Sequence, residues 1–148
     1  MAFDLKGMEE GVWFPFQDSR VDDSGEVEWL EFDTTEEVCF KKIDPDQLQE
    51  IEEKNRGKKK VTPVLNKLTR QMELVTTFEQ SAKDKINDSK DFWNCAIVDW
   101  KISDLEGKAI ECNKENKYKL VKGSGKFLRF ANRCMEQLGE LEVKAGKN

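Results

Sequence analysis

The pattern that most restricts the fold of this chain is a series of apolar residues spaced three and four positions apart through its middle. The series follows Pro63 and comprises Leu65, Leu68, Met72, Val75, Phe78, Ala82, Ile86, Trp93 and Ile97. Because an α-helix turns once every 3.6 residues, such a series lies on one helical face. The spacing predicts one long amphipathic helix from about 63 to 98, bent near 87–90, whose stripe packs within the monomer or against a partner helix.

Three further helices are expected from their end signals. Asp44 and Pro45 open a short helix with Leu48 and Ile51 as its buried stripe. Asn113 caps another that runs to about residue 122 and ends at the Gly-Ser-Gly of 123–125. The last helix, from about 126 to 143, carries a continuous apolar stripe of Phe127, Leu128, Phe130, Ala131, Cys134, Met135, Leu138 and Leu141.

The first 43 residues carry strand signals instead. Three extended segments, GVWFPF, EVEWLEF and EEVCFKKI, are separated by DDSG and DTT. They predict a three-stranded antiparallel meander. Pro15 has no N–H to donate, which places the first strand at an edge of the sheet.

These elements predict an α+β fold in which a small N-terminal antiparallel β-meander packs on a mainly α-helical C-terminal two-thirds. Charged residues make up 37% of the chain, but nine Phe and four Trp supply a core. We expect a single domain over 1–148, with a β-rich part at 1–43, a helical part at 44–98 that contains an exposed basic loop at 54–60, and a turn plus two helices at 99–148.

The absence of histidine from all 148 residues restricts the chemistry. It removes Ser-His-Asp and Cys-His catalysis and every histidine-ligated metal site. The four cysteines are far apart in the sequence, without a C-x-x-C pair, so we expect reduced thiols. No pair among the thirty acidic residues stands out as a general acid and base. We therefore expect no catalytic residue, no metal and no cofactor, and a protein that is not an enzyme.

The sequence also lacks targeting signals. Its first residues have no basic and apolar run typical of a signal peptide, and nowhere do about 18 apolar residues follow one another. We expect a cytoplasmic protein that does not enter a membrane.

Charge is divided unevenly along the chain. Residues 1–53 hold 17 acids against 4 bases, whereas residues 54–148 hold 13 acids against 21 bases. This division favours head-to-tail self-association or an oppositely charged partner, or else marks the solvated faces of one domain. The cluster of Arg56, Lys58, Lys59 and Lys60 has the charge to contact phosphates. A pI near 5.0 and the lack of a nucleic-acid-binding motif favour a solvated loop and disfavour nucleic acid as a partner.

A family resemblance rests on the C-terminal half. The chain reads Val98-Asp99-Trp100, then Asp104-x-x-Gly107-Lys108, Ile110, Asn113-Lys114-Glu115-Asn116, a Gly-containing turn, an amphipathic helix and Lys147-Asn148. Over about residues 86–148, and more loosely before them, this order resembles the tail assembly chaperones of long-tailed bacteriophages and related prophages. Asp99, Trp100, Asp104, Gly107 and Asn113 carry the motif. Cys112 stands where a Thr or Ser cap is usual, and the basic insert at 54–60 is a second departure.

The resemblance implies a host bacterial cytoplasmic protein that binds the tape measure protein and keeps it soluble while tail tube subunits polymerise, with the tail tube protein as a possible second partner. It also implies absence from the finished particle and a longer form made by a frameshift near Gly146. We expect the two apolar stripes to provide the partner-binding residues, namely Leu68, Met72, Val75, Phe78, Phe127, Phe130 and Met135. The alternatives are a structural tail or head-tail joining protein retained in the virion, and a nucleic-acid-binding regulator that uses the 54–60 segment.

Overall fold

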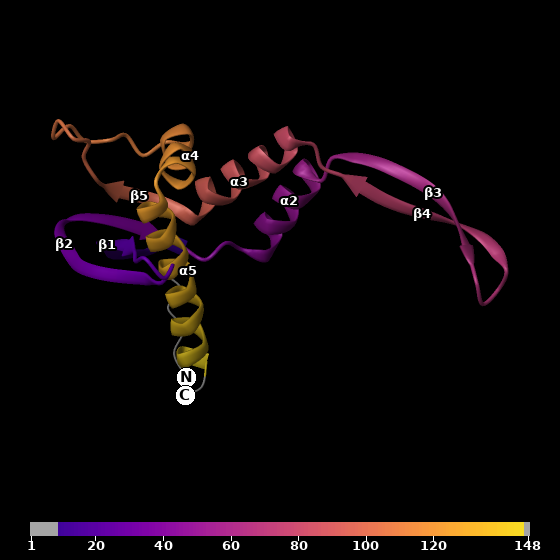
Figure 1. Ribbon diagram of the computed structural model, residues 1–148, viewed down its shortest axis with the longest axis horizontal. Helices are drawn as coiled ribbons and strands as arrows, with labels where there is room; N and C mark the ends of the chain where they lie inside the picture. The colour runs from indigo at the N-terminus through magenta and orange to yellow at the C-terminus, as the bar shows by residue number, and fades with distance from the viewer. Residues whose placement is uncertain (1–8, 147–148) are drawn as a thin grey trace.

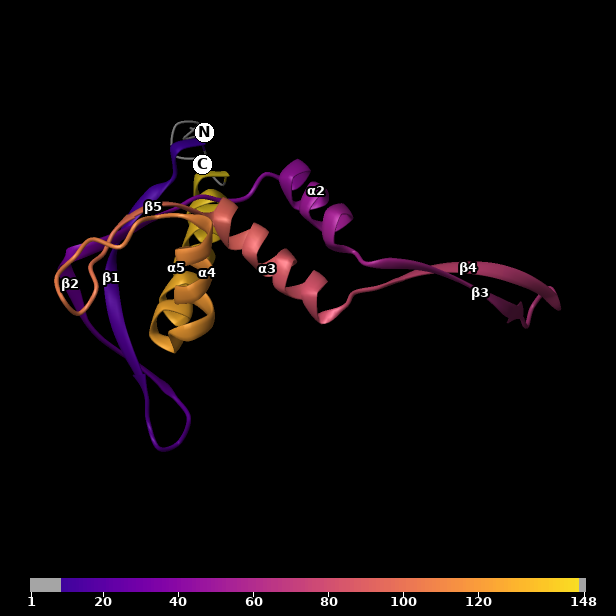
Figure 2. The same ribbon diagram turned by 90° about the horizontal axis from the view of Figure 1, so that it is seen from above.

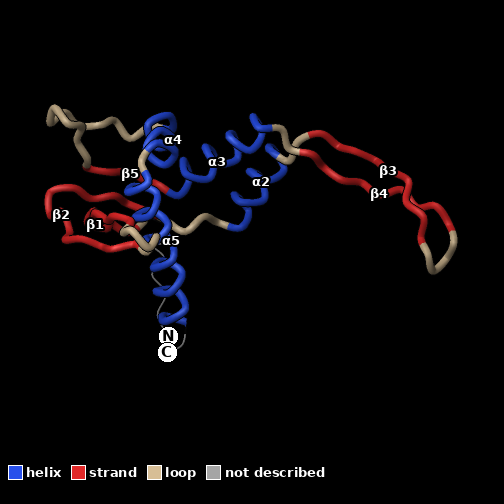
Figure 3. The backbone as a smooth tube through the Cα atoms, in the orientation of Figure 1, coloured by secondary structure: helices blue, strands red, loops and turns tan. Residues whose placement is uncertain are grey.

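The computed structural model describes the backbone of residues 9–146 and the side chains of residues 9–32 and 35–139. Over this part of the chain the fold is mixed α and β (Figures 1 and 3). The strands are β1 (Val12–Val21), β2 (Val27–Phe40), β3 (Lys58–Asn66), β4 (Gln71–Glu79) and β5 (Ile97–Lys101). The helices are α2 (Pro45–Asn55), α3 (Ala82–Ala96), α4 (Lys114–Gly123) and α5 (Gly125–Gly146). The expected Lys147-Asn148 tail lies outside the described residues.

The main sheet is antiparallel with strand order β1-β2-β5. The first strand lies at an edge, as Pro15 predicts. The expected meander within 11–43 is wrong, because its second and third segments form the single long strand β2. The Asp33-Thr34-Thr35 segment contains no glycine or proline, and its threonines favour extended backbone, so the chain continues without a turn. The third strand of the sheet comes from 97–101 instead.

Three of the expected helices begin and end close to their predicted bounds. The Asp44 carboxylate accepts a hydrogen bond from the Asp46 N–H and caps α2. The Asn113 side chain accepts one from the Asn116 N–H and caps α4. The chain turns at Ser124, where α4 ends and α5 begins, as the Gly-Ser-Gly predicts.

The expected long helix over 63–98 is wrong. Residues 58–79 form the antiparallel hairpin β3–β4, and only 82–96 are helical, starting at a capping box between Ser81 and Asp84. Pro63 lies mid-strand, and a segment rich in Val and Thr favours a pleated strand over a helix. The expected basic loop at 54–60 is wrong as well, since Asn55 ends α2 and Lys58 starts β3.

The core lies where α5 crosses one face of the main sheet, next to α3 and α4. The Phe130 ring packs edge-on against Phe16 and Phe40, with centroids 5.0 Å and 5.8 Å away. The Arg129 guanidinium donates from Nε to the hydroxyl of the buried Ser19 at 2.8 Å, which ties α5 to β1. Hydrophobic burial of aromatic rings and this buried hydrogen bond hold helix and sheet together.

The hairpin β3–β4, which we call the arm, projects away from this core (Figures 1 and 2). It leaves the body at the end of α2 and returns at the start of α3. All of its side chains are exposed except that of Asn66, which is half-buried. An isolated two-stranded hairpin is marginally stable in water. The arm therefore stands as an element that lacks a packing partner within the described chain.

Candidate partner-binding surfaces

The register of the arm separates its side chains into an apolar face and a polar face. Directly opposite pairs are Val61 with Thr76, Pro63 with Leu74, and Leu65 with Met72. Because opposite and alternate residues of a hairpin share a face, one face collects most of the apolar residues. We define the apolar face of the arm as Val61, Pro63, Leu65, Met72, Leu74 and Phe78. Leu74 and Met72 are 75% and 63% exposed, so this face is open to water.

Four of the seven expected partner-binding residues lie on the arm. Met72 and Phe78 belong to its apolar face, whereas Val75 points to the polar face. Leu68 is almost fully exposed in the turn at the tip. Their helical spacing therefore does not reflect a helix: Leu68 lies in a turn, and the other three lie on the strand β4. The signal for the hairpin is the alternation of Val61, Pro63 and Leu65.

The other three residues lie on α5 and face the core. Phe127 and Phe130 are buried, and Met135 is partly buried against the same cluster. Phe127 and Phe130 hold the helix on the sheet and are not accessible to a partner, whereas Met135 keeps part of its surface exposed.

The five motif residues have structural roles. Trp100 is buried and donates from Nε1 to the Ile110 carbonyl at 2.7 Å. The Asp104 carboxylate accepts from the Glu106 and Lys108 N–H groups, and Gly107 adopts a positive φ of 82° in the same turn. Asp99 accepts a hydrogen bond from the N–H of Trp100. Asn113, as described above, caps α4.

A groove lies between α2 and α3 at the root of the arm. Leu48, Ile51 and Phe92 provide its apolar lining, and its volume is about 520 Å³. Glu52, Gln80, Lys85, Asp88 and Ser89 complete it. The expected burial of Leu48 and Ile51 is wrong, because Leu48 is 42% exposed and Ile51 is half-buried. α2 packs on α3, and its apolar stripe lines the groove and is not sealed in the core.

The root of the arm is fixed by a hydrogen bond and a glycine. The Gln80 amide donates to the Asn55 carbonyl at 2.6 Å, joining the two ends of the hairpin. Gly57 has a positive φ of 84°, and a Cβ at this position would overlap the Glu79 carbonyl. The two strands approach each other so closely that only glycine fits here.

Beneath the groove, a buried carboxylate joins α2, α3 and α4. Asp91 accepts hydrogen bonds from the Asn55 amide at 2.9 Å and from the Lys114 ammonium at 2.6 Å. Lys54 lies 3.4 Å from the same carboxylate. Burial by itself raises the pKa of Asp91, but the hydrogen bonds from Lys114 and Asn55 outweigh it and hold that pKa below its usual value. The network fixes the helix pair that forms the groove.

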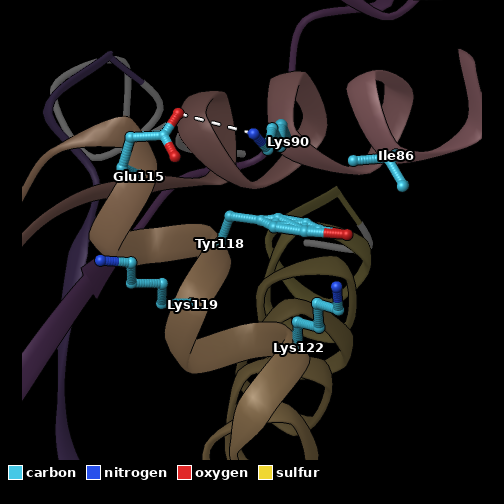
Figure 4. A pocket seen from close by; sticks show the side chains of 6 residues that line it. All are labelled: Ile86, Lys90, Glu115, Tyr118, Lys119 and Lys122. Atoms are coloured by element: carbon cyan, nitrogen blue, oxygen red, sulfur yellow. Dashed lines mark ion pairs between the residues drawn. The ribbon is translucent and has the colours of Figure 1, made fainter. Parts of the chain in front are cut away.

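A second hollow between α3 and α4 is basic (Figure 4). The Lys90 and Lys122 ammonium groups lie 5.2 Å and 5.8 Å from the centre of the Tyr118 ring, and Lys119 completes the basic side. Glu115 forms an ion pair with Lys90 at 3.5 Å. The volume of this hollow is about 220 Å³; Lys119 and Lys122 are exposed, whereas Lys90 is half-buried.

Comparison with known proteins gives no relative for this chain: no family model, no curated protein and no solved structure matches it. Between residues 9 and 146, no helix has both the length and the apolar character needed to cross a membrane. The same part of the chain contains no group of three or more Cys, Asp or Glu side chains that could hold a metal ion.

Proposed function

We propose that the protein works by binding another protein chain, as a tail assembly chaperone that keeps the tape measure protein soluble. The observation that carries this proposal is the apolar groove between α2 and α3. A helix with one apolar stripe fits a groove formed by two packed helices, where it contacts side chains such as Leu48, Ile51 and Phe92. The charged rim, which has both signs, suits the polar flanks of such a helix.

The choice of the tape measure protein as the partner rests on the resemblance of residues 86–148 to tail assembly chaperones. A tape measure protein is a long helical chain with exposed apolar stripes, which are the feature that the groove accommodates. In this proposal the groove takes the place of the continuous helix expected over 63–98. A groove open to water can release its ligand, as an assembly factor must when tube subunits replace it.

Two observations on the arm disfavour the nucleic-acid alternative. Lys60 pairs with Glu79 at 3.2 Å, and the Arg56 guanidinium lies 4.3 Å from the centre of the Phe78 ring. Half of the basic cluster of 56–60 is therefore engaged by the arm itself. If the polar face of the arm bound the phosphates of a nucleic acid, the apolar face would also stay exposed to water.

The proposal is tested by co-expression of the full chain with the tape measure protein expected from the long helical reading frame downstream of its gene. We expect soluble tape measure protein only when the chain is present. Leu48→Glu places a charge in the groove at an exposed position, so the variant folds but retains at least about tenfold less tape measure protein. Leu105→Glu, at a fully exposed position of the loop between β5 and α4, is the matched control and retains the wild-type amount.

Tape measure protein that stays soluble without this chain would refute the proposal, as would a Leu48→Glu variant that retains the wild-type amount. Mass spectrometry of purified particles separates the structural alternative. A chaperone is absent from them, and a tail or head-tail joining protein is present.

A further inference from the structure

We propose that the arm of one copy docks on the β1–β2 hairpin of a second copy through its apolar face and its basic tip. This inference concerns a surface separate from the α2–α3 groove and goes beyond the proposed function. It combines three observations: the uncovered apolar face of the arm, its positive charge, and a matching acidic and apolar surface elsewhere on the same chain.

The arm carries the charge of one sign. Residues 58–79 hold five bases against two acids, a net charge of +3. Among the described residues, the side chains of Lys67 and Arg70 at the tip have no ion-pair partner. These cations lie next to Leu65 and Met72, where the apolar face ends. The tip is thus an apolar surface bordered by available positive charge.

The β1–β2 hairpin carries the opposite charge. Residues 12–40 hold nine acids against a single base, a net charge of −8. Its distal end extends beyond the helices that cover the main sheet (Figure 2). There Val21 and Val27 form a directly opposed pair, 52% and 44% exposed, with Asp23 and Glu26 in the turn between them. This end is an apolar surface bordered by negative charge.

The two surfaces are complementary in both respects. Contact between them removes apolar side chains from water and brings Lys67 and Arg70 near Asp23 and Glu26. The arm cannot reach the hairpin of its own chain, because the two project from different sides of the body (Figures 1 and 2). An arm that faces an acidic hairpin on a second molecule forms a heterologous, head-to-tail contact. Repetition of this contact produces a chain of copies or a closed ring.

One cation at the root of the arm and one on the arm already contact other side chains within the described structure, so they are not assigned to the contact between copies. Arg56 stacks on Phe78, and Lys60 pairs with Glu79. The Asp22 carboxylate of the hairpin is also engaged, since it accepts hydrogen bonds within its own turn from Ser24 and Glu26. The charge pairs that hold two copies together are therefore those of the tip with Asp23 and Glu26.

The test is sedimentation velocity of the full chain over a range of protein concentrations. We expect the wild type to associate, and to associate less as salt shortens the Debye length from about 10 Å at 0.1 M to about 3 Å at 1 M. Lys67→Glu with Arg70→Glu should weaken association at least about tenfold, because attraction becomes repulsion. Asp23→Lys with Glu26→Lys should do the same. A mixture of the two double variants should associate again, because reversed arms meet reversed hairpins.

The matched control is Lys108→Glu with Lys119→Glu, which makes the same change in net charge away from both surfaces. It should associate like the wild type. The inference is overturned if the wild type stays monomeric at low salt, if the control weakens association as much as the arm variant, or if the mixture fails to associate. Arm variants that lose tape measure protein but keep self-association would assign the arm to a different partner and also overturn it. Leu48→Glu, which tests the groove, leaves self-association unchanged.

Discussion

Removal of the Asp91 carboxylate should destabilise the protein more than any other single change to a charged side chain of α3. Asp91→Ala deletes a hydrogen bond from the buried Asn55 and an ion pair with Lys114. A hydrogen bond to a charged group contributes about 1.5–3 kcal/mol to the free energy of unfolding. Lys114 is 42% exposed and returns to water, so its pair adds only about 0–1 kcal/mol. The expected loss is about 1.5–4 kcal/mol.

Urea unfolding followed by tryptophan fluorescence measures this loss. With a denaturant slope of about 2 kcal/mol per molar, the midpoint for Asp91→Ala should fall by about 0.8–2 M. Asp88→Ala is the matched control on the same helix, because the Asp88 side chain has no hydrogen bond or ion pair within the described structure. Its midpoint should change by less than about 0.5 kcal/mol in equivalent free energy.

The same residue predicts a pH dependence. Since the pKa of Asp91 in the folded chain lies below its unfolded value of about 3.9, its contribution is present above that pH and is lost as pH falls through the folded pKa. The difference in midpoint between the wild type and Asp91→Asn should therefore be full at pH 7 and shrink toward pH 3. A difference that stays constant with pH, or an Asp91→Ala midpoint equal to that of Asp88→Ala, would refute the reasoning.

Two further changes test the arm root and the core. Gly57→Ala should cost about 1–3 kcal/mol and increase amide exchange throughout β3 and β4, because its Cβ overlaps the Glu79 carbonyl at a positive φ. Gly25→Ala has a similar φ and open space, so it should show a smaller loss confined to its turn, and equal losses would contradict the steric argument. Burial raises the pKa of the Cys134 thiol to about 12, so maleimide at pH 8 should label Cys134 only after unfolding. Mass spectrometry that finds it labelled in the folded chain as fast as in urea would contradict its placement.

The sequence predicted the helices whose ends are determined by local chemistry. Asp44 and Asn113 cap α2 and α4 with their own side chains, and the Gly-Ser-Gly turn separates α4 from α5. These signals act within four residues of the helix end, so a single sequence contains all the information they need.

The arm was missed because its residues fit two periods at once. Leu65, Leu68, Met72, Val75 and Phe78 recur at helical steps, yet Leu65, Met72 and Phe78 also share one face of two strands joined by a turn. The turn itself has no glycine: the Asn66 side chain accepts hydrogen bonds from the N–H groups of Leu68 and Thr69, and Arg70 takes a positive φ of 54°. Without a glycine signal, periodicity alone favours the helix.

The groove could not be predicted because it depends on contacts distant in sequence. Asn55 reaches Asp91 across 36 residues, and that contact decides which face of α2 stays open. Leu48 does belong to an apolar stripe on one face of α2, as its spacing predicts, but this stripe is not buried in the core. Which apolar stripe is covered and which is left for a ligand is set by the packing of the whole chain.

Both ends of the arm meet the body at the same place, where Gln80 donates to Asn55, so the length of the arm determines how far its tip lies from the body. Each strand has nine residues, and at about 3.4 Å per residue the ladder measures about 30 Å. Residues added or deleted in opposed pairs along the ladder alter this length and leave the helices untouched. A longer or shorter hairpin in a related chain would then change the distance between the ligand of the groove and the partner of the tip. The spacing of an assembly would be set by the number of residue pairs in the hairpin, with the helical body unchanged.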